Sequence, residues 1–214
     1  VSLIQTPPKS RKPIETTVRY FDWDTICLYI ERELSRGGQV YFLHNRVDGL
    51  SFLTQKLQNA FPRVVVENIH GQMSSKKLES KILSFFNGGI DILACTTIIE
   101  SGLDVTNANC IIVNDAQNFG LSQLYQIRGR VGRGQRQAHC LLLVPRKQLE
   151  QRAHRRLKTL EQYTSLGSGY DISMKDLEIR GAGSLFGYKQ SGHISSVGFE
   201  MYCDLLKSEV DLVM

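Results

Sequence analysis

The run Gln-Ile-Arg-Gly-Arg-Val-Gly-Arg, which starts at Gln126, has the composition of a polyphosphate site. On a period of 3.6 residues Gln126, Arg130 and Arg133 fall at i, i+4 and i+7, so a helix would carry them on one face. Arginine presents a planar fork of donors to phosphate oxygens and stays charged at ordinary pH. Gly129 and Gly132 would each cost a helix about 1 kcal/mol relative to alanine, which indicates that the backbone must approach a ligand or another domain. A solvated basic face is the alternative, but it gives the two glycines no role.

Short apolar runs alternate with amphipathic stretches on both sides of this run, which predicts an α/β fold with a parallel sheet and helices on both faces. Asp22 or Asp24 can cap the first helix, and Gly37 and Gly38 end it. Ligands of such sheets bind at the carboxyl ends of the strands, so the loops that follow the strands are candidate sites. We expect strands over 16–20, 40–43, 64–66, 90–95, 110–113 and 140–144, and helices over 26–34, 50–61, 78–86 and from 122 into the arginine run.

Polar residues and glycines fill three of these loops, namely His44-Asn45-Arg46, His70-Gly71-Gln72 and residues 96–104. Thr96 would place a hydroxyl and a backbone N–H where a strand ends and a helix begins, which suits a phosphate of a nucleic acid strand. Gly102 lets the main chain approach a nucleotide. Asp104 can accept a hydrogen bond from a ribose hydroxyl or orient an arginine, and a capping or turn role is its alternative.

The run from Gln126 resembles motif VI of the superfamily 2 helicases and translocases in its QxxGRxGR form, and the three loops resemble motifs IV, IVa and V. The resemblance implies a RecA-like P-loop NTPase fold, of which this chain would be the second lobe. In that family an arginine finger of motif VI reaches the γ-phosphate of ATP, bound with Mg²⁺ mainly by the first lobe. A comparable group contributes about 10³ to 10⁵ in rate. By resemblance the catalytic residues are Gln126, Arg130 and Arg133, and Gly102, Asp104 and the two arginines contact the nucleotide.

The same resemblance implies DNA contacts in the loops, by Asn45, Arg46, His70, Gly71, Gln72, Thr96 and Thr97. For His70 the alternative is an imidazole hydrogen-bonded to its own turn. Glu100 is either a surface residue or part of the coupling between ATP and DNA. Neither a Walker A loop nor an acidic magnesium box is present, so we expect this fragment alone to be inactive as an ATPase.

The composition shifts after residue 145 toward two amphipathic helices. The first has apolar positions Leu149, Ala153, Leu157 and Leu160, and the second has them between Phe199 and Val213. Helices of this size would pair as a hairpin. The basic residues of the first helix could contact nucleic acid or could simply be solvated.

A glycine-rich stretch lies between these helices, from Asp176 to Gly187 and on to Gln190. Its G-x-G-x-x-x-G spacing, with no apolar strand ahead of it, argues against a dinucleotide site. It resembles the TRG motif, a translocation element shared by the transcription-repair coupling factors (Mfd) and the RecG-type branched-DNA helicases. The resemblance assigns the coupling of ATP turnover to movement to Arg180 and Gln190, with Arg180 linking loop and hairpin.

Less specific sequence features favour the resemblance to the coupling factors over the resemblance to the RecG type. They are the stretches 4–8, 119–124 and 177–183, and the absence of a proline after Arg180-Gly181. Ser101 departs from the arginine of many superfamily 2 proteins, although the coupling factors commonly have a small hydroxyl residue there.

Composition sets the remaining limits. The 214 residues carry a net charge of +5, which mildly favours a polyanionic partner. Five single cysteines predict reduced core residues of a cytoplasmic protein, and neither they nor the histidines have metal-ligand spacing, so we expect no metal site. No apolar run is long enough to span a membrane. We expect a fragment with a linker over 1–15, a RecA-like lobe over 16–145, and the TRG hairpin and translocation loop over 146–214.

The resemblance as a whole implies part of an ATP-dependent translocase on double-stranded DNA. Such a protein displaces stalled RNA polymerase and couples transcription to nucleotide excision repair. Contacts with the polymerase and with an excision-repair damage-recognition protein would lie in domains outside this fragment. Two alternatives remain: a RecG-type helicase acting on branched DNA, and a non-enzymatic nucleic-acid-binding module.

Overall fold

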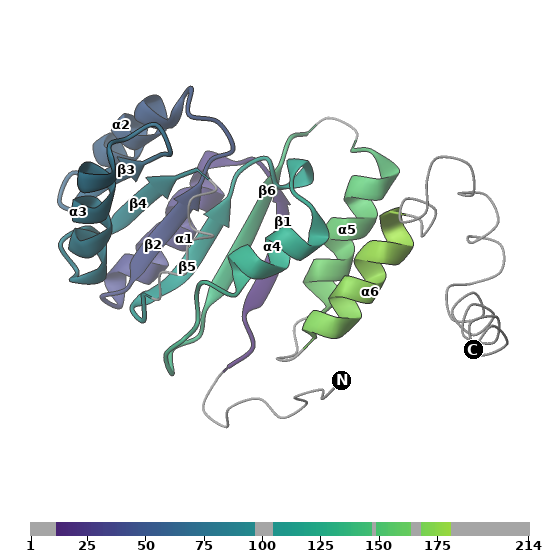
Figure 1. The fold of residues 1–214 in the computed structure, drawn as a ribbon. Coiled ribbons are helices and arrows are strands. Elements are labelled where there is room, and N and C mark those ends of the chain that lie inside the picture. The colour runs from purple at the N-terminus through teal and green to yellow at the C-terminus, as the bar shows by residue number, and fades with distance from the viewer. Residues whose placement is uncertain (1–11, 97–104, 147–148, 164–167, 181–214) are drawn as a thin grey trace, which may run out of the picture.

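Six parallel strands form one sheet in the computed structural model, which describes residues 12–96, 105–146, 149–163 and 168–180, without the side chains of Tyr170, Leu177 and Arg180. The order across the sheet is β1-β6-β5-β2-β4-β3, and every pairing is parallel. The predicted parallel sheet is therefore confirmed (Figure 1). The strands are β1 (Glu15–Tyr20), β2 (Gln39–Leu43), β3 (Val66–Ile69), β4 (Ile92–Cys95), β5 (Ala108–Val113) and β6 (His139–Val144).

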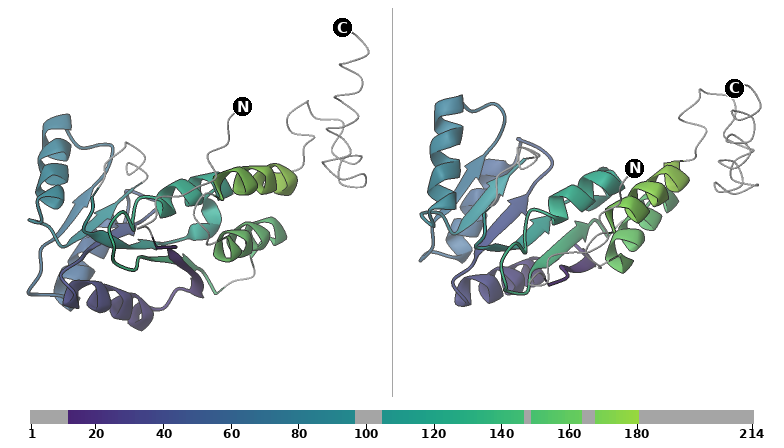
Figure 2. Two further views of the ribbon diagram at one scale, coloured as in Figure 1. Left: turned by 90° about the horizontal axis from the view of Figure 1, so that it is seen from below. Right: turned by 60° about the horizontal axis from the view of Figure 1, so that its bottom comes forward.

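Helices cover both faces of this sheet, as predicted. They are α1 (Trp23–Ser35), α2 (Leu50–Ala60), α3 (Ser75–Phe86), the 3-10 turn η2 (Ala116–Asn118), α4 (Leu121–Arg128), α5 (Gln151–Gln162) and α6 (Gly169–Arg180). Figure 2 shows α1 on one side of the sheet and α4 and α6 on the other.

Alternation along the strands divides the core between the two faces. In β2, Val40 and Phe42 pack with Ile26 and Ile30 of α1, whereas Tyr41 and Leu43 belong to the cluster on the opposite face. That second cluster includes apolar residues of α4, α5 and α6, namely Leu121, Leu124, Ile127, Leu157, Leu160 and Ile172. The sheet thus fixes α4 and the two following helices on one face.

The cysteines of the described part lie where the sequence predicted. Cys95, Cys110 and Cys140 are buried in the sheet, and Cys27 is partly buried on α1. Burial raises the pKa of the Cys140 thiol to about 12, which nearby Arg128 only partly opposes. Such thiols are protonated and unreactive at neutral pH. Cys203 lies outside the described residues.

The helical pair after the sheet differs from the prediction. Helix α5 begins at Gln151, several residues later than its apolar pattern suggested, and it packs against α6. Helix α6 was not predicted, because its apolar residues are spread around the helix and the glycines after Arg180 indicated a loop. The expected partner helix over 199–213 lies outside the described residues, so that pairing stays a prediction.

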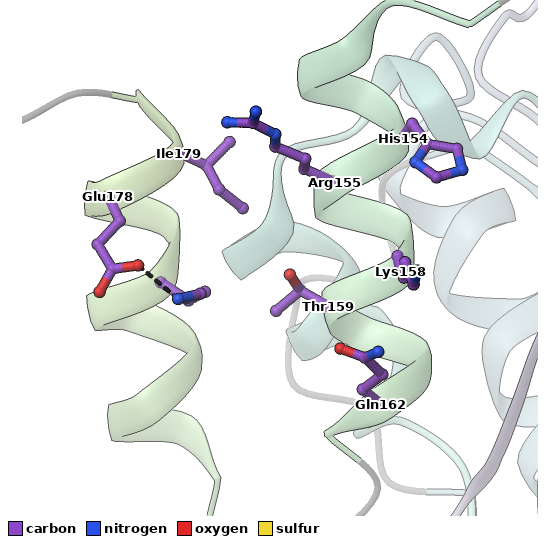
Figure 3. Close-up of a pocket in the computed structure, with 8 residues that line it drawn as sticks. His154, Arg155, Lys158, Thr159, Gln162, Glu178 and Ile179 are labelled. Carbon is purple, nitrogen blue, oxygen red and sulfur yellow. Dashed lines mark ion pairs between the residues drawn. The ribbon is translucent and has the colours of Figure 1, made fainter. Parts of the chain in front are cut away.

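A groove of about 460 Å³ lies between α5 and α6. Figure 3 shows its walls, with Arg155, Lys158 and Thr159 on α5 and Glu178 and Ile179 on α6. Lys175 Nζ lies 2.6 Å from Glu178 Oε2, and this half-exposed pair contributes little to stability. No helix within the described ranges combines the length and apolar character needed to cross a bilayer.

The end of α1 is fixed by a buried carboxylate, whereas its start has the predicted cap. Asp22 Oδ2 accepts hydrogen bonds from the backbone N–H and the hydroxyl of Thr25, at 2.9 and 2.6 Å. At the other end Glu33 is only 1% exposed and accepts hydrogen bonds from Arg36 and Asn109. A Cβ on Gly38 would overlap Glu33 Oε1.

We therefore expect Gly38→Ala to lower the free energy of unfolding by about 1–3 kcal/mol, since the added carbon displaces a buried, paired carboxylate. Urea denaturation of the 214-residue chain measures this. Gly134→Ala is the control, because its Cβ would make only ordinary contacts with Thr106, at 3.5 Å to O and 3.8 Å to Cγ2. Equal denaturation midpoints for the two variants would contradict the role of Gly38.

Candidate functional site

The carboxyl edge of the sheet gathers the loops that follow four adjacent strands. His44 N donates to Cys95 O at 2.8 Å, and Asn114 N donates to Leu43 O at 2.9 Å, so the ends of β2, β4 and β5 adjoin. Thr96 N donates to Ile69 O at 3.4 Å, which joins the ends of β4 and β3. The first two polar loops predicted from the sequence, and Thr96 at the start of the third, therefore share one edge of the sheet.

Exposed polar groups occupy the first two of these loops. Asn45 and Arg46 are exposed after β2, and Gly71 and Gln72 are exposed after β3, beside a half-buried His70. Arg46 Nη2 lies 3.6 Å from Asp48 Oδ2, but both side chains are at least three-quarters exposed, so the pair is weak. These residues are positioned to meet a large polar ligand at this edge.

Thr96 differs from this exposed group because it is only 8% exposed. Its backbone N–H is directed to Ile69 O, so a phosphate at this strand end would rely on the hydroxyl rather than on that N–H. The helix expected after it would start within residues 97–104, which lie outside the described part.

A hydrogen-bonded cluster at the same edge was missed by the sequence interpretation. Asn114 Nδ2 lies 3.1 Å from His44 Nδ1 and donates to Asp115 Oδ2 at 3.2 Å, and Gln117 Nε2 donates to Asp115 Oδ1 at 3.2 Å. Asp115 has φ +52°, a left-handed conformation that aspartate tolerates better than most residues. The only sequence signal was a polar Asn-Asp pair directly after a buried strand.

The predicted helical face of Gln126, Arg130 and Arg133 is wrong, because α4 ends at Arg128. Gly129 is the C-cap residue, and Gly132 has φ +71°, so the two later arginines lie in a turn and an irregular segment. Gln126 and Arg133 are exposed and Arg130 is partly buried. Of the two glycines, Gly129 caps the helix and Gly132 allows the left-handed turn beyond it.

This segment reaches the opposite edge of the sheet from the polar loops. A Cβ on Gly132 would lie 2.9 Å from Ala138 Cβ and 3.2 Å from Ile14 Cγ1, next to the starts of β6 and β1. Figure 1 likewise shows the connection from α4 to β6 at the far end of the sheet from the strand tips. The eight residues of α4 span roughly 12 Å at 1.5 Å per residue, which separates the two groups of predicted residues.

Arg128, the last residue of α4, is buried although it is charged, with 4% of its surface exposed. Its Nη1 donates to Leu160 O at 3.0 Å and Tyr163 O at 2.7 Å, and lies 3.5 Å from Thr16 Oγ1. Its guanidinium carbon lies 5.1 Å from the ring centroid of Tyr125. Burial lowers the pKa of this guanidinium, but arginine stays charged at any ordinary pH. No feature of the sequence distinguishes the buried Arg128 from Arg130 and Arg133, which are more exposed.

A family profile described as "Helicase conserved C-terminal domain" matches residues 23–135. The chain belongs to this helicase family. The matched residues run from the start of α1 through the arginine run, so they include both the polar loops and the arginine segment. The family resemblance inferred from the motifs is thereby confirmed.

Curated relatives extend the similarity of this helicase lobe beyond the family profile. The transcription-repair-coupling factor of Myxococcus xanthus is 48% identical over 211 residues, 98% of this chain and 18% of that protein. The one of Bacillus subtilis (strain 168) is 46% identical over 212 residues, 99% of this chain and 18% of that protein. The chain thus spans 18% of the length of these relatives.

A solved structure of RecG bound to a three-way DNA junction also matches the helicase lobe. It gives a TM-score of 0.73 at 30% identity and covers 92% of this chain and 26% of that one. The predicted RecA-like second-lobe fold is therefore confirmed. The sequence similarity to the coupling factors is higher than the similarity to RecG.

Several predicted site residues lie outside the described part, namely Thr97, Glu100, Gly102 and Asp104 of the lobe and Gln190 of the translocation loop. Arg180 is the last residue of α6, and its side chain is not described. The roles assigned to these residues stay predictions.

Gly129 and Gly132 give a matched test of the arginine segment. We expect Gly132→Ala to destabilise the chain by about 1–3 kcal/mol, because φ is positive and the space is filled. Gly129 has φ −67°, and its Cβ would meet only backbone oxygens at 3.4 and 3.5 Å, so Gly129→Ala leaves folding nearly unchanged. Thermal unfolding of both variants measures the difference, and equal losses of stability would refute this distinction.

Proposed function

We propose that this chain is the second motor lobe, residues 16–145, with the helical hairpin and translocation loop, residues 146–214, of a transcription-repair coupling factor. The parent protein would be an ATP-dependent translocase on double-stranded DNA. The observation that carries the proposal is the 48% identity to a coupling factor across 98% of the chain. The exposed polar loops and the separate arginine segment supply the two surfaces that such a motor requires.

The arginine segment fits a role toward a nucleotide held by another lobe. Arg133 is exposed and Arg130 partly so, and both lie where the chain has left α4. Guanidinium groups on such a surface segment can reach phosphate oxygens bound elsewhere, and they stabilise charge that develops during phosphoryl transfer. In this proposal Gln126, Arg130 and Arg133 are catalytic, and Gly102 and Asp104 contact the nucleotide.

ATP with Mg²⁺ would be bound mainly by the first lobe, since this chain has no Walker A loop. The role of this chain is to close over the nucleotide and bring its arginines to the phosphates. We therefore propose that the 214-residue piece alone does not hydrolyse ATP, and that mixing it with ATP and DNA yields no turnover.

The carboxyl edge is the proposed DNA surface. Asn45, Arg46, Gly71 and Gln72 are exposed there, and His70 and Thr96 lie beside them. Exposed amides and a guanidinium suit contacts to DNA phosphates, which position a protein without reading sequence. Thr97 completes this proposed surface. The net charge of +5 agrees with a polyanionic partner.

Coupling of ATP turnover to movement is assigned to Glu100, Arg180 and Gln190. Of these, Arg180 ends α6, the helix that packs on α4 and α5. RNA polymerase and an excision-repair damage-recognition protein would bind parts of the parent outside this chain, and the protein would act in the bacterial cytoplasm.

Arg133→Ala in the full-length parent is the first test. We expect ATP turnover to fall by about 10³- to 10⁵-fold, the range for loss of an arginine finger. Arg136→Ala is a matched control, because this exposed arginine three residues later donates to Arg36 O within the chain, at 2.8 Å. DNA-stimulated ATPase measures both variants. If Arg133→Ala kept normal turnover, a non-enzymatic nucleic-acid-binding module would be the better interpretation.

A second test separates the coupling factor from a branched-DNA helicase, which the similarity to RecG keeps as the second candidate. An RNA polymerase is halted on DNA by nucleotide starvation, and release of its transcript is followed with full-length protein and ATP. We expect ATP-dependent release that is lost in Arg180→Ala, while ATP is still hydrolysed. Absence of release, together with unwinding of a synthetic four-way junction, would favour the RecG-type function.

A further inference from the structure

Arg128 joins the end of α4 to the end of α5. Helix α5 ends at Gln162, and its last carbonyls have no partner within the helix. The buried Arg128 guanidinium donates to one of them, Leu160 O, and to the carbonyl of the C-cap residue Tyr163. A cation at a helix C-terminus is further stabilised by the helix dipole. The last turn of α5 is thus a built receptor for this side chain.

Further contacts keep the α5/α6 pair in place against α4. Ser122 Oγ, in the first turn of α4, donates to Asp176 Oδ2 of α6 at 2.8 Å, and Asp176 is only 4% exposed. Gly169, at the start of α6, faces Tyr125, because a Cβ there would lie 3.3 Å from Tyr125 Oη. Both ends of α4 are therefore held by the helical pair.

Strand β1 and the turn η2 each hold α5 at one additional point. Glu161 Oε1 accepts a hydrogen bond from Val18 N of β1 at 3.0 Å. Arg156 Nη2 donates to Gln117 O of η2 at 3.1 Å. Helix α5 is therefore not a loose appendage, and a side chain anchored to its end is anchored to the whole lobe.

Arg128 lies directly before the arginine segment, so the contacts that hold it also affect where that segment begins. It precedes Gly129 and Arg130 directly, and its own carbonyl accepts from Val131 N at 3.4 Å. The place where the chain leaves α4, and hence the starting point of the arginine segment, is set by where Arg128 is held. A glycine-containing segment would otherwise have wide conformational freedom at this point.

We propose that Arg128 is a positioning residue for ATP hydrolysis: anchored in the last turn of α5, it fixes the exit of the chain from α4 and so places Arg130 and Arg133. The inference rests on the proposed function. In this proposal α5 supports the nucleotide site structurally, in addition to the hairpin's part in coupling ATP turnover to movement. Arg128 itself is buried and does not touch the nucleotide.

The test compares Arg128→Gln with Arg128→Lys in the full-length parent. The Gln variant removes the charge and the reach to the carbonyls, whereas Lys keeps the charge and can donate to at least one. We expect Arg128→Gln to lower kcat for ATP by about 10- to 100-fold, the effect of displacing a catalytic group by about 1 Å. KM for ATP stays within about twofold, because the nucleotide is bound mainly by the first lobe. Arg128→Lys recovers part of kcat.

Arg32→Gln is the matched control, since Arg32 is an exposed arginine on α1, on the opposite face of the sheet. Ser122→Ala is a second variant, which loosens α4 from α6 without leaving a buried cation unpaired. We expect it to lower kcat by a smaller factor in the same direction. If Arg128→Gln does not fold, Ser122→Ala decides alone.

A kcat for Arg128→Gln equal to that of Arg32→Gln would overturn the positioning role, as would equal losses in the Lys and Gln variants. If Arg128→Gln does not fold, an unchanged kcat in Ser122→Ala would also overturn the positioning role. These outcomes remain distinct from failure of the proposed function, because Arg133→Ala tests that function separately. A collapse of turnover in Arg133→Ala with normal turnover in Arg128→Gln would leave the function standing and remove only this inference.

Discussion

The burial of the Arg128 guanidinium is the constraint on which this arrangement depends. Removing a guanidinium from water costs several kcal/mol unless protein acceptors replace the solvent. Here two carbonyls from the end of α5 do so, with the Thr16 hydroxyl 3.5 Å away. The three acceptors come from β1, α5 and the residue after α5, so satisfying one cation brings together elements from both ends of the described chain. Without α5 the cation would be buried and unpaired, or α4 would have to move.

The parallel sheet explains why the site has two separate parts. The strands are parallel, so the carboxyl ends of β2, β3, β4 and β5 gather at one edge regardless of their distance in sequence. Helix α4 then runs back along one face and delivers the arginine segment to the other edge. A nucleic acid strand and a nucleotide could therefore contact the same lobe without competing for space, and the short, rigid α4 connects the two surfaces mechanically.

The sequence predicted those features for which one local pattern decides the outcome. The apolar run Val40 to Leu43 could only be a buried strand. It misled where two signals conflicted. The spacing of Gln126, Arg130 and Arg133 suits a helix, but α4 ends at Arg128, with Gly129 as its C-cap and Gly132 in a left-handed conformation beyond it. Helix α6 was missed because its packing is tertiary, through Ile172 and Asp176, and no periodicity announces it. The burial of Arg128 likewise depends on residues more than thirty positions away.

The pairing of β1 with β6 has a consequence for how the lobe forms during synthesis. Among the described strands β1 comes first in sequence, yet it lies at an edge of the sheet and pairs with β6, the last of them, with Glu15 opposite His139 and Tyr20 opposite Val144. Until the ribosome has delivered β6, the first strand has no place in the sheet, while β2 to β5 can already pair among themselves. Contacts of such long sequence separation slow folding, because the intervening chain must be closed before they form. Strand β1 therefore stays unpaired while the residues between it and β6 are made, and exposed strand edges of this kind favour aggregation in partly folded chains.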